Sequence, residues 1–227
     1  MKKNFGLILL ETVTLFIVIA ACLFLPSETS SWSAGWLFIL LFVGFFTGVN
    51  FWLSEHNPSL LKERIRLGTS DQKGWDKVLF PLIQLLIVGW LVLISLDAAR
   101  FHWSSMPVWI QIVGTIVLAC SFYILFLTFK ENSYLSPVVR LQEERGQTVI
   151  SSGPYQYVRH PMYSGIILFV LGTPLMLGSL YGVFFGLVTI VILAWRAVLE
   201  ERTLQKELPG YPAYVARVKY RFIPFVW

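Results

Sequence analysis

The chain has 227 residues, of which 56% are hydrophobic and only 14% charged, and its mean hydropathy is +0.67. Soluble domains average about 45–50% apolar and about 25% charged residues, so this composition excludes a soluble or disordered chain and predicts a membrane protein. The formal net charge of +5 does not indicate a nucleic-acid partner, because basic residues in a membrane protein report the side of the bilayer that they occupy.

Four long apolar segments in the first half of the chain predict transmembrane helices. A helix needs about 20 apolar residues to cross roughly 30 Å of hydrocarbon. The segments are residues 5–25, 34–53, 78–96 and 107–129. The first follows two lysines and could pass for a cleaved signal segment, but its apolar run continues past Cys22, so we expect an uncleaved span.

A fifth apolar stretch, from Tyr163 to Leu199, is too long for a single span. Gly178, Ser179 and Gly182 lie near its middle and can end one helix and begin another. We therefore predict a helical hairpin here. The expected fold class is an all-α integral membrane protein with about six transmembrane segments, the last two forming the hairpin.

The basic residues give an independent test of this topology, since they collect in cytoplasmic segments. In a six-span arrangement the cytoplasmic segments are the N-terminus and residues 54–77, 130–162 and 196–227. They hold all but one of the 18 lysines and arginines, the exception being Arg100. An odd number of crossings would place the last cluster opposite the others, so we expect both termini to face the cytoplasm.

The two parts of the chain differ in kind. Residues 1–129 consist of four spans and short loops, whereas residues 130–227 carry a polar loop, the hairpin and a basic, tyrosine-rich tail. We expect the parts to form one structural unit, with the chemistry in the second. Within the loop, residues 138–141 and 147–150 flank a polar turn, which predicts a strand, a turn and a second strand.

A crowded polar segment, Arg159-His160-Pro161, precedes the hairpin. A proline suits the first turn of a helix, whose unpaired N–H groups attract an anion. On this interpretation the segment is a binding site. The alternative is a basic flank that ends a span, with a proline that starts a helix.

Arg196, Glu200 and Glu201 lie near the end of the last span, and Arg196 and Glu200 share one helix face. Two adjacent carboxylates beside a membrane suit a cationic ligand such as a sulfonium or ammonium group. The alternative is a surface ion pair between positions four residues apart.

The tail combines aromatic and basic residues, from Tyr211 to Trp227. Such residues commonly anchor a chain at the lipid headgroups. The alternative is a lid that folds over the start of the hairpin. Glu11, inside the first span, is costly unless it is paired or used.

Several site classes are absent from the sequence. It contains no G-x-G-x-x-G, P-loop or H-E-x-x-H pattern, which argues against a soluble-type nucleotide site. Histidine occurs only at positions 56, 102 and 160, and neither histidines nor cysteines have a ligand spacing. We therefore predict no metal site.

Several motifs in order resemble the isoprenylcysteine carboxyl methyltransferase family. That family belongs to a wider group of integral-membrane methyltransferases that includes the phospholipid N-methyltransferases. The motifs are GPYQYVRHPMYSG at residues 153–165, Gly172-Thr173-Pro174, Glu200-Glu201, Tyr211-x-x-Tyr214 and Arg221-Phe222-Ile223-Pro224. Weaker support comes from Asn132 and from Asn57-Pro58-x-Leu60-Leu61-x-Glu63-Arg64.

The resemblance implies an S-adenosylmethionine-dependent methyltransferase with a cofactor pocket on the cytoplasmic side. The implied acceptor is small or lipid-like, for example an isoprenylcysteine-like carboxylate. The cofactor-binding residues implied are His160, Pro161, Tyr163, Gly165, Gly172, Glu200 and Glu201. The catalytic residues implied are Arg196, His160 and Glu201. Several motifs occur in the same order as in the family. This shared order favours the functional interpretation of each motif over its structural alternative.

Two alternatives stay open from the sequence. Sterol reductases share an Arg-His-Pro-x-Tyr-x-Gly segment and use NADPH, but they usually carry an acidic residue where this chain has Ile166. The second alternative is a non-catalytic membrane module.

Overall fold

The structure, a computed structural model, describes residues 2–65 and 71–227, with side chains from Phe5 onward. Within these residues the chain is all-helical and holds no β-strand. The predicted all-α class is therefore confirmed.

Six long helices form the bundle. They are α1 (Lys2–Ser27), α2 (Ser33–His56), α4 (Asp76–Ser95), α5 (Val108–Glu131), α6 (Pro161–Leu177) and α7 (Leu180–Glu207). Five of them are long and apolar enough to cross a membrane, whereas α6 has 17 residues. A helix of that length rises only about 25 Å, short of the roughly 30 Å hydrocarbon core. The count of six crossings thus stays a prediction.

The short elements lie at the ends of the long helices. They are α3 (Pro58–Ile65), α8 (Tyr211–Arg217), a π-helical turn (Leu96–Phe101) that prolongs α4, and 3-10 turns at Glu143–Arg145 and Gly153–Gln156.

The predicted hairpin is confirmed at the residues expected to form it. Gly178 follows α6 in the left-handed region, at φ 85°, which glycine adopts without strain. Ser179 caps α7, and its Oγ accepts a hydrogen bond from Gly182 N at 2.9 Å. The chain therefore reverses direction within two residues.

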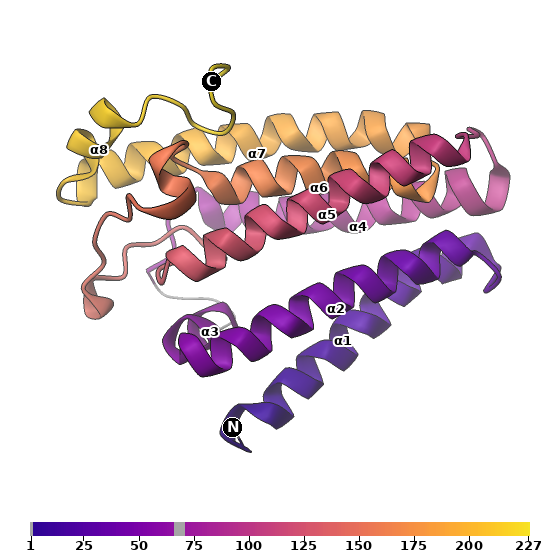
Figure 1. Cartoon of the computed structure of the whole chain (residues 1–227), viewed down its shortest axis with the longest axis horizontal. Coiled ribbons are helices and arrows are strands. Elements are labelled where there is room, and N and C mark those ends of the chain that lie inside the picture. Colours follow the sequence, from indigo (N-terminus) through magenta and orange to yellow (C-terminus); the bar gives the residue numbers. More distant parts are fainter. Residues whose placement is uncertain (1, 66–70) are drawn as a thin grey trace.

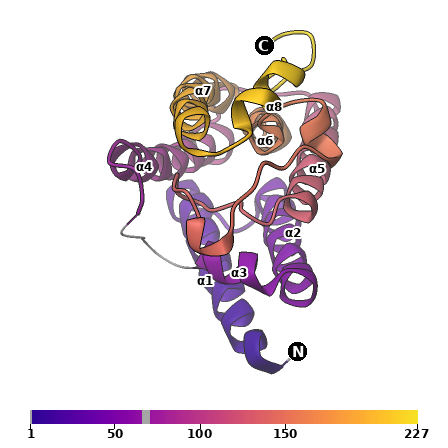
Figure 2. The same cartoon turned by 90° about the vertical axis from the view of Figure 1, so that its left-hand side faces the viewer.

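The helices form two layers. Figure 1 shows α1, α2 and α3 on one side and α4 to α7 on the other, and Figure 2 shows the same division from the end. Trp90 of α4 is buried at the centre of the bundle and donates to Gly182 O at 2.7 Å. Phe38 of α2 and Val170 of α6 belong to the same core, so side chains join the two layers.

One end of the bundle carries α3, residues 132–160 and the tail from α8 to Trp227, and we call it the polar end (left in Figure 1). The predicted strand–turn–strand in this loop is wrong. Side chains satisfy the backbone there instead: Gln142 N donates to Gln147 Oε1 and Val139 N donates to Asp76 Oδ2, both at 2.8 Å. These groups are then not free to form a sheet ladder.

The opposite end is closed around a buried carboxylate. Asp97 is fully buried and lies in the π-helical turn after α4. It accepts hydrogen bonds from Ser104 N and Oγ at 2.8 and 2.7 Å, from Ser179 Oγ at 2.6 Å and from Tyr181 N at 3.2 Å. This junction ties the end of α4 to the start of α7.

Candidate active site

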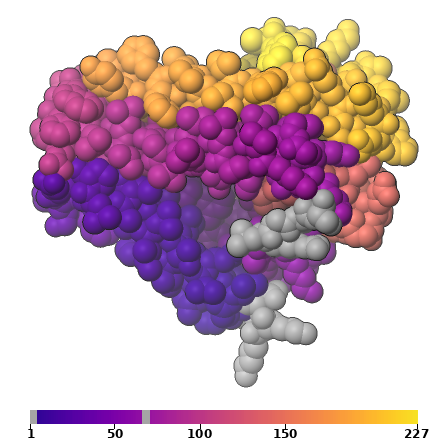
Figure 3. Space-filling model, turned by 180° about the vertical axis from the view of Figure 1, so that it is seen from behind, coloured from indigo at the N-terminus to yellow at the C-terminus, as the bar shows by residue number. Residues whose placement is uncertain are grey.

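A cavity of about 610 Å³ extends from the polar end into the space between the two helix layers. This volume lies within the usual range for small-molecule sites. Seen from behind, the surface is hollowed between the N-terminal helices and α4 (Figure 3). The cavity's polar part is lined by the loop, the tail and the ends of α6 and α7. Its apolar part includes Ile19, Phe42, Leu91 and Phe169.

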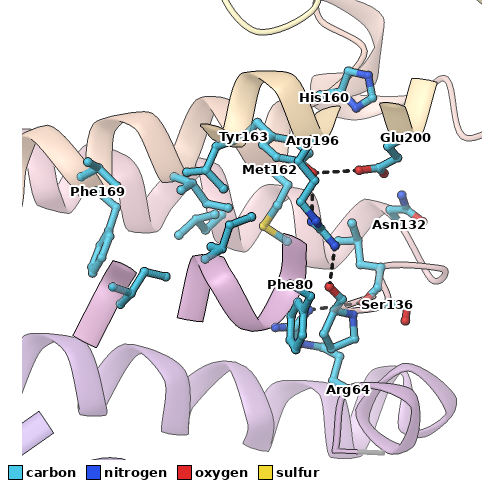
Figure 4. A pocket seen from close by; sticks show the side chains of 18 of the residues that line it. Arg64, Phe80, Asn132, Ser136, His160, Met162, Tyr163, Phe169, Arg196 and Glu200 are labelled. Atoms are coloured by element: carbon cyan, nitrogen blue, oxygen red, sulfur yellow. Dashed lines mark hydrogen bonds between the residues drawn. The ribbon is translucent and has the colours of Figure 1, made fainter. Parts of the chain in front are cut away.

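Three predicted site residues meet at the junction of the polar and apolar parts (Figure 4). The hydroxyl of Tyr163 donates to Glu200 Oε2 at 2.9 Å and accepts from Arg196 Nη1 at 2.9 Å. All three side chains line the cavity. Glu200 and Arg196 are thus joined through a phenol rather than directly, and the surface ion pair considered as an alternative is not formed.

Arg196 is held by a residue that sequence reasoning missed. Its Nε donates to Asp76 Oδ1 at 2.8 Å, and its Nη2 donates to Pro137 O at 3.0 Å. Asp76 is fully buried at the start of α4. An aspartate at a helix start is ordinary in sequence, so only the fold reveals its partner. The buried pair fixes the guanidinium beside Tyr163.

Glu201 faces away from the cavity into a cluster of cations. It is 3% exposed, and it accepts from Arg221 Nε at 2.9 Å and pairs with Arg159 Nη2 at 3.1 Å. His160 Nε2 lies 3.4 Å from its Oε2, and Gln205 Nε2 donates to its Oε1 at 3.2 Å. The structure therefore makes Glu201 the centre of an internal network and leaves Glu200 as the carboxylate in the cavity.

The tail packs over the start of α6. Arg159 N donates to Tyr220 O and His160 N to Arg221 O, both at 2.9 Å, and Ser164 Oγ donates to Phe222 O at 2.5 Å. Pro161 is the first residue of α6, as predicted. The tail thus occupies the position expected of a lid and covers the helix start proposed for an anion.

Two predicted cofactor residues, Gly165 and Gly172, lie elsewhere. A Cβ atom on Gly165 would meet Leu125 Cδ2 at 2.7 Å, and one on Gly172 would meet Leu118 N at 2.8 Å. Both contacts are with α5, and neither glycine lines the cavity. Close packing of α5 on α6 explains both glycines.

Three tyrosines surround the polar part of the cavity. Burial raises the pKa of Tyr155, Tyr211 and Tyr214, so all three stay neutral phenols at physiological pH. Asn132 Nδ2 donates to Tyr155 Oη at 2.7 Å, and Tyr214 Oη donates to Tyr155 O at 2.8 Å. The Tyr211 hydroxyl is buried and has no hydrogen-bond partner within the described residues. An unpaired hydroxyl beside a cavity is suited to a ligand.

Comparisons with known proteins support a methyltransferase. Residues 109–209 match the phospholipid methyltransferase family. A solved structure of the eukaryotic intramembrane Ras methyltransferase ICMT (isoprenylcysteine carboxyl methyltransferase) is similar, with a TM-score of 0.54 and 14% sequence identity over 98% of this chain and 86% of that chain. At this identity the likeness shows the fold. No curated protein matches the sequence at a significant level.

The fold and the matched segment together define a membrane-embedded methyltransferase. The resemblance to the integral-membrane methyltransferases that include the isoprenylcysteine carboxyl and phospholipid enzymes is thereby confirmed. The matched segment contains His160, Tyr163, Arg196 and Glu200. It therefore favours the methyltransferase over the reductase and the non-catalytic alternatives.

Proposed function

We propose that the protein transfers a methyl group from S-adenosylmethionine to a lipophilic acceptor in the cavity. The observation that carries the proposal is the cavity itself, which joins a polar part at one end of the bundle to an apolar part between the helices. A water-soluble donor and a lipid-like acceptor would need these two environments side by side.

The residues around the polar part fit S-adenosylmethionine. Glu200 is a cavity carboxylate whose only hydrogen-bond donor within the described residues is Tyr163, so it can face a cation. The free hydroxyl of Tyr211 and the rings of Tyr155 and Tyr214 suit the polar edge and the flat face of an adenosine. When bound, the cofactor supplies an electrophilic methyl group on a sulfonium.

The cavity residues have separate roles in this proposal. Glu200 and Tyr211 bind the cofactor, and Arg196 and Tyr163, at the junction with the apolar part, orient the reacting groups. Orientation of donor and acceptor is the main task, since it can contribute about 7–11 kcal/mol to a displacement reaction. His160 and Glu201 are positioning residues, because the imidazole faces Glu201 and the carboxylate faces the tail.

We also propose that the polar end faces the cytoplasm, where the cofactor is available. The support is the distribution of lysine and arginine, of which only Arg100 falls outside the predicted cytoplasmic segments. Because α6 is short, its polar start would lie slightly within the membrane surface. An acceptor anchored in the bilayer could then reach the site from the side.

Calorimetry of the protein purified in a nonionic detergent tests the proposal. S-adenosylhomocysteine should bind the wild type, and NADPH should not. Glu200→Gln should weaken S-adenosylhomocysteine binding by roughly tenfold or more, because a charged hydrogen-bond partner of the ammonium group is lost.

Glu207→Gln is the matched control, since Glu207 lies on the same helix and pairs with Lys73 at the surface. This variant should bind like the wild type. Binding of neither ligand to the wild type, or equal affinity of both variants, would overturn the proposal.

A further inference from the structure

Arg64 brings a further positive charge to the cavity, from the layer opposite Arg196. It lies on α3 and lines the cavity. Figure 4 shows Arg64 across the cavity from Glu200, with Arg196 between them. Sequence reasoning placed Arg64 only among the weaker supports of a resemblance and gave it no role.

The helix that carries Arg64 is firmly held. Glu63 is 6% exposed and forms a two-point ion pair with Arg140, whose Nε and Nη2 both donate at 2.8 Å. Asn57 joins α2 to α3: its Oδ1 accepts from Leu60 N at 3.1 Å, and its Nδ2 donates to Ser133 Oγ at 2.8 Å. The backbone of α3 at Arg64 is thus held by neighbouring residues.

The guanidinium of Arg64 has unused hydrogen-bonding capacity. Within the described residues its one hydrogen bond runs from Nη1 to Leu135 O at 3.3 Å, and it stacks over the ring of Phe129 at 4.5 Å. A guanidinium has five N–H donors. No described carboxylate lies within ion-pair distance of it. Glu11, on α1, acts on it electrostatically, and the Glu11 carboxylate accepts a hydrogen bond from Asn50 Nδ2 at 3.0 Å.

Arg64 stays charged in this environment. Burial lowers its pKa to about 10, which is still well above neutral pH. A half-buried guanidinium in direct contact with no described carboxylate keeps an uncompensated desolvation cost, and an anionic ligand would offset that cost.

We propose that Arg64 binds a carboxylate or phosphate group on the lipophilic acceptor. This inference rests on the proposed function, and it narrows the acceptor to a lipid-like anion. The acceptor is favoured over the cofactor because Arg64 belongs to the layer of α1 to α3, whose other lining residues are mainly apolar, such as Leu15 and Phe46. Glu200 and Tyr211, the residues proposed for the cofactor, lie on α7 and α8.

Binding of matched single-chain probes tests the inference. Dodecanoate, dodecyl phosphate and uncharged dodecanamide are titrated into the full-length protein in dodecyl maltoside at pH 7.5, with S-adenosylhomocysteine present. The measured quantity is the ratio of anion affinity to amide affinity. For at least one of the two anions, this ratio should be roughly tenfold or more higher in the wild type than in Arg64→Gln. Arg64→Lys should keep part of this preference because it keeps the charge.

Lys62→Gln is the matched control, since Lys62 lies on the same helix but is exposed, and its probe affinities should equal those of the wild type. S-adenosylhomocysteine affinity should be unchanged in every variant. An unchanged anion preference in Arg64→Gln overturns the inference, as does a loss of S-adenosylhomocysteine binding there, which would assign Arg64 to the cofactor. If Arg64→Gln does not fold, the test uses the wild type and Arg64→Lys. In that case, equal affinity of the wild type for the anions and the amide refutes the inference. Failure of the wild type to bind S-adenosylhomocysteine would instead refute the proposed function.

Discussion

Each end of the bundle buries a carboxylate, but the two carboxylates have different partners. At the far end, Asp97 is surrounded by neutral donors from Ser104, Ser179 and Tyr181. At the polar end, Glu201 is surrounded by the side chains of Arg159, His160 and Arg221. The first network closes a junction between helices. The second holds the tail against α6, next to the cavity.

The cavity, unlike the two buried carboxylates, offers several polar groups with spare hydrogen-bonding capacity to a ligand. Glu200, Arg64 and the hydroxyl of Tyr211 all line it and are only partly paired or unpaired. Burial and charge alone therefore do not identify the site. Unused hydrogen-bonding capacity beside a cavity marks it better.

The largest effect on stability is expected for Glu201→Gln. The substitution keeps the shape of the side chain but leaves Arg159 and Arg221 without a counter-ion. Removing one partner of a buried ion pair costs about 3–5 kcal/mol. A thermal melt in detergent should show a lower melting temperature and a tail that is cut earlier by protease, whereas Glu207→Gln should leave both unchanged. An unaltered melt would mean that Glu201 does not hold the tail.

A smaller loss of stability is expected for Asp97→Asn. The amide can replace at most part of the acceptor capacity that four donors use, and each buried donor left unpaired costs about 1–3 kcal/mol. The same melting assay measures it. Binding of S-adenosylhomocysteine to the folded variant should equal that of the wild type, and weaker binding would show that the far end is coupled to the site.

Tyr211→Phe should affect binding but not stability. The substitution removes a buried hydroxyl that has no partner within the described residues, so the melting temperature should stay the same or rise slightly. If the hydroxyl binds the cofactor, calorimetry should show roughly threefold to tenfold weaker binding of S-adenosylhomocysteine. Tyr123→Phe, at an exposed site on α5, is the control. Unchanged affinity in Tyr211→Phe would remove Tyr211 from the site.

The smallest expected effect is a pH dependence at α3. Hydrogen bonds from Arg140 lower the pKa of Glu63 from its ordinary value of 4.5. The pKa of Glu63 is lower in the folded state than in the unfolded state. The ion pair therefore stabilises the fold above pH 4.5, and this stabilisation is lost as the pH falls through the folded-state pKa. The difference in melting temperature between wild type and Glu63→Gln should therefore shrink below pH 4.5. A constant difference would contradict this assignment.

Much of the fold could be predicted because membrane spans are local features of the sequence. Apolar length identified the six long helices, and Gly178 and Ser179 marked the hairpin. The loop could not be predicted in the same way. Its strand-like pattern gives way to side-chain contacts with distant residues, such as the bond between Val139 N and Asp76.

Part of the site could also be predicted. Helical spacing placed Arg196 and Glu200 on one face, and the resemblance added Tyr163, which joins them in the structure. Asp76 and Arg64 were missed, because each meets the site through the packing of helices far apart in the chain. The sequence could not predict that Glu200 lines the cavity whereas Glu201 joins the internal network, since adjacent residues on a helix differ only in the direction they face.

A structure of the protein in lipid nanodiscs with S-adenosylhomocysteine would show where the cofactor binds. We expect the ligand in the polar part of the cavity, with its ammonium group at Glu200 and its adenosine at Tyr211, and we expect the cations around Glu201 to stay in place. A ligand bound at the opposite end of the bundle, or one that displaces Glu201 from Arg159 and Arg221, would contradict this expectation.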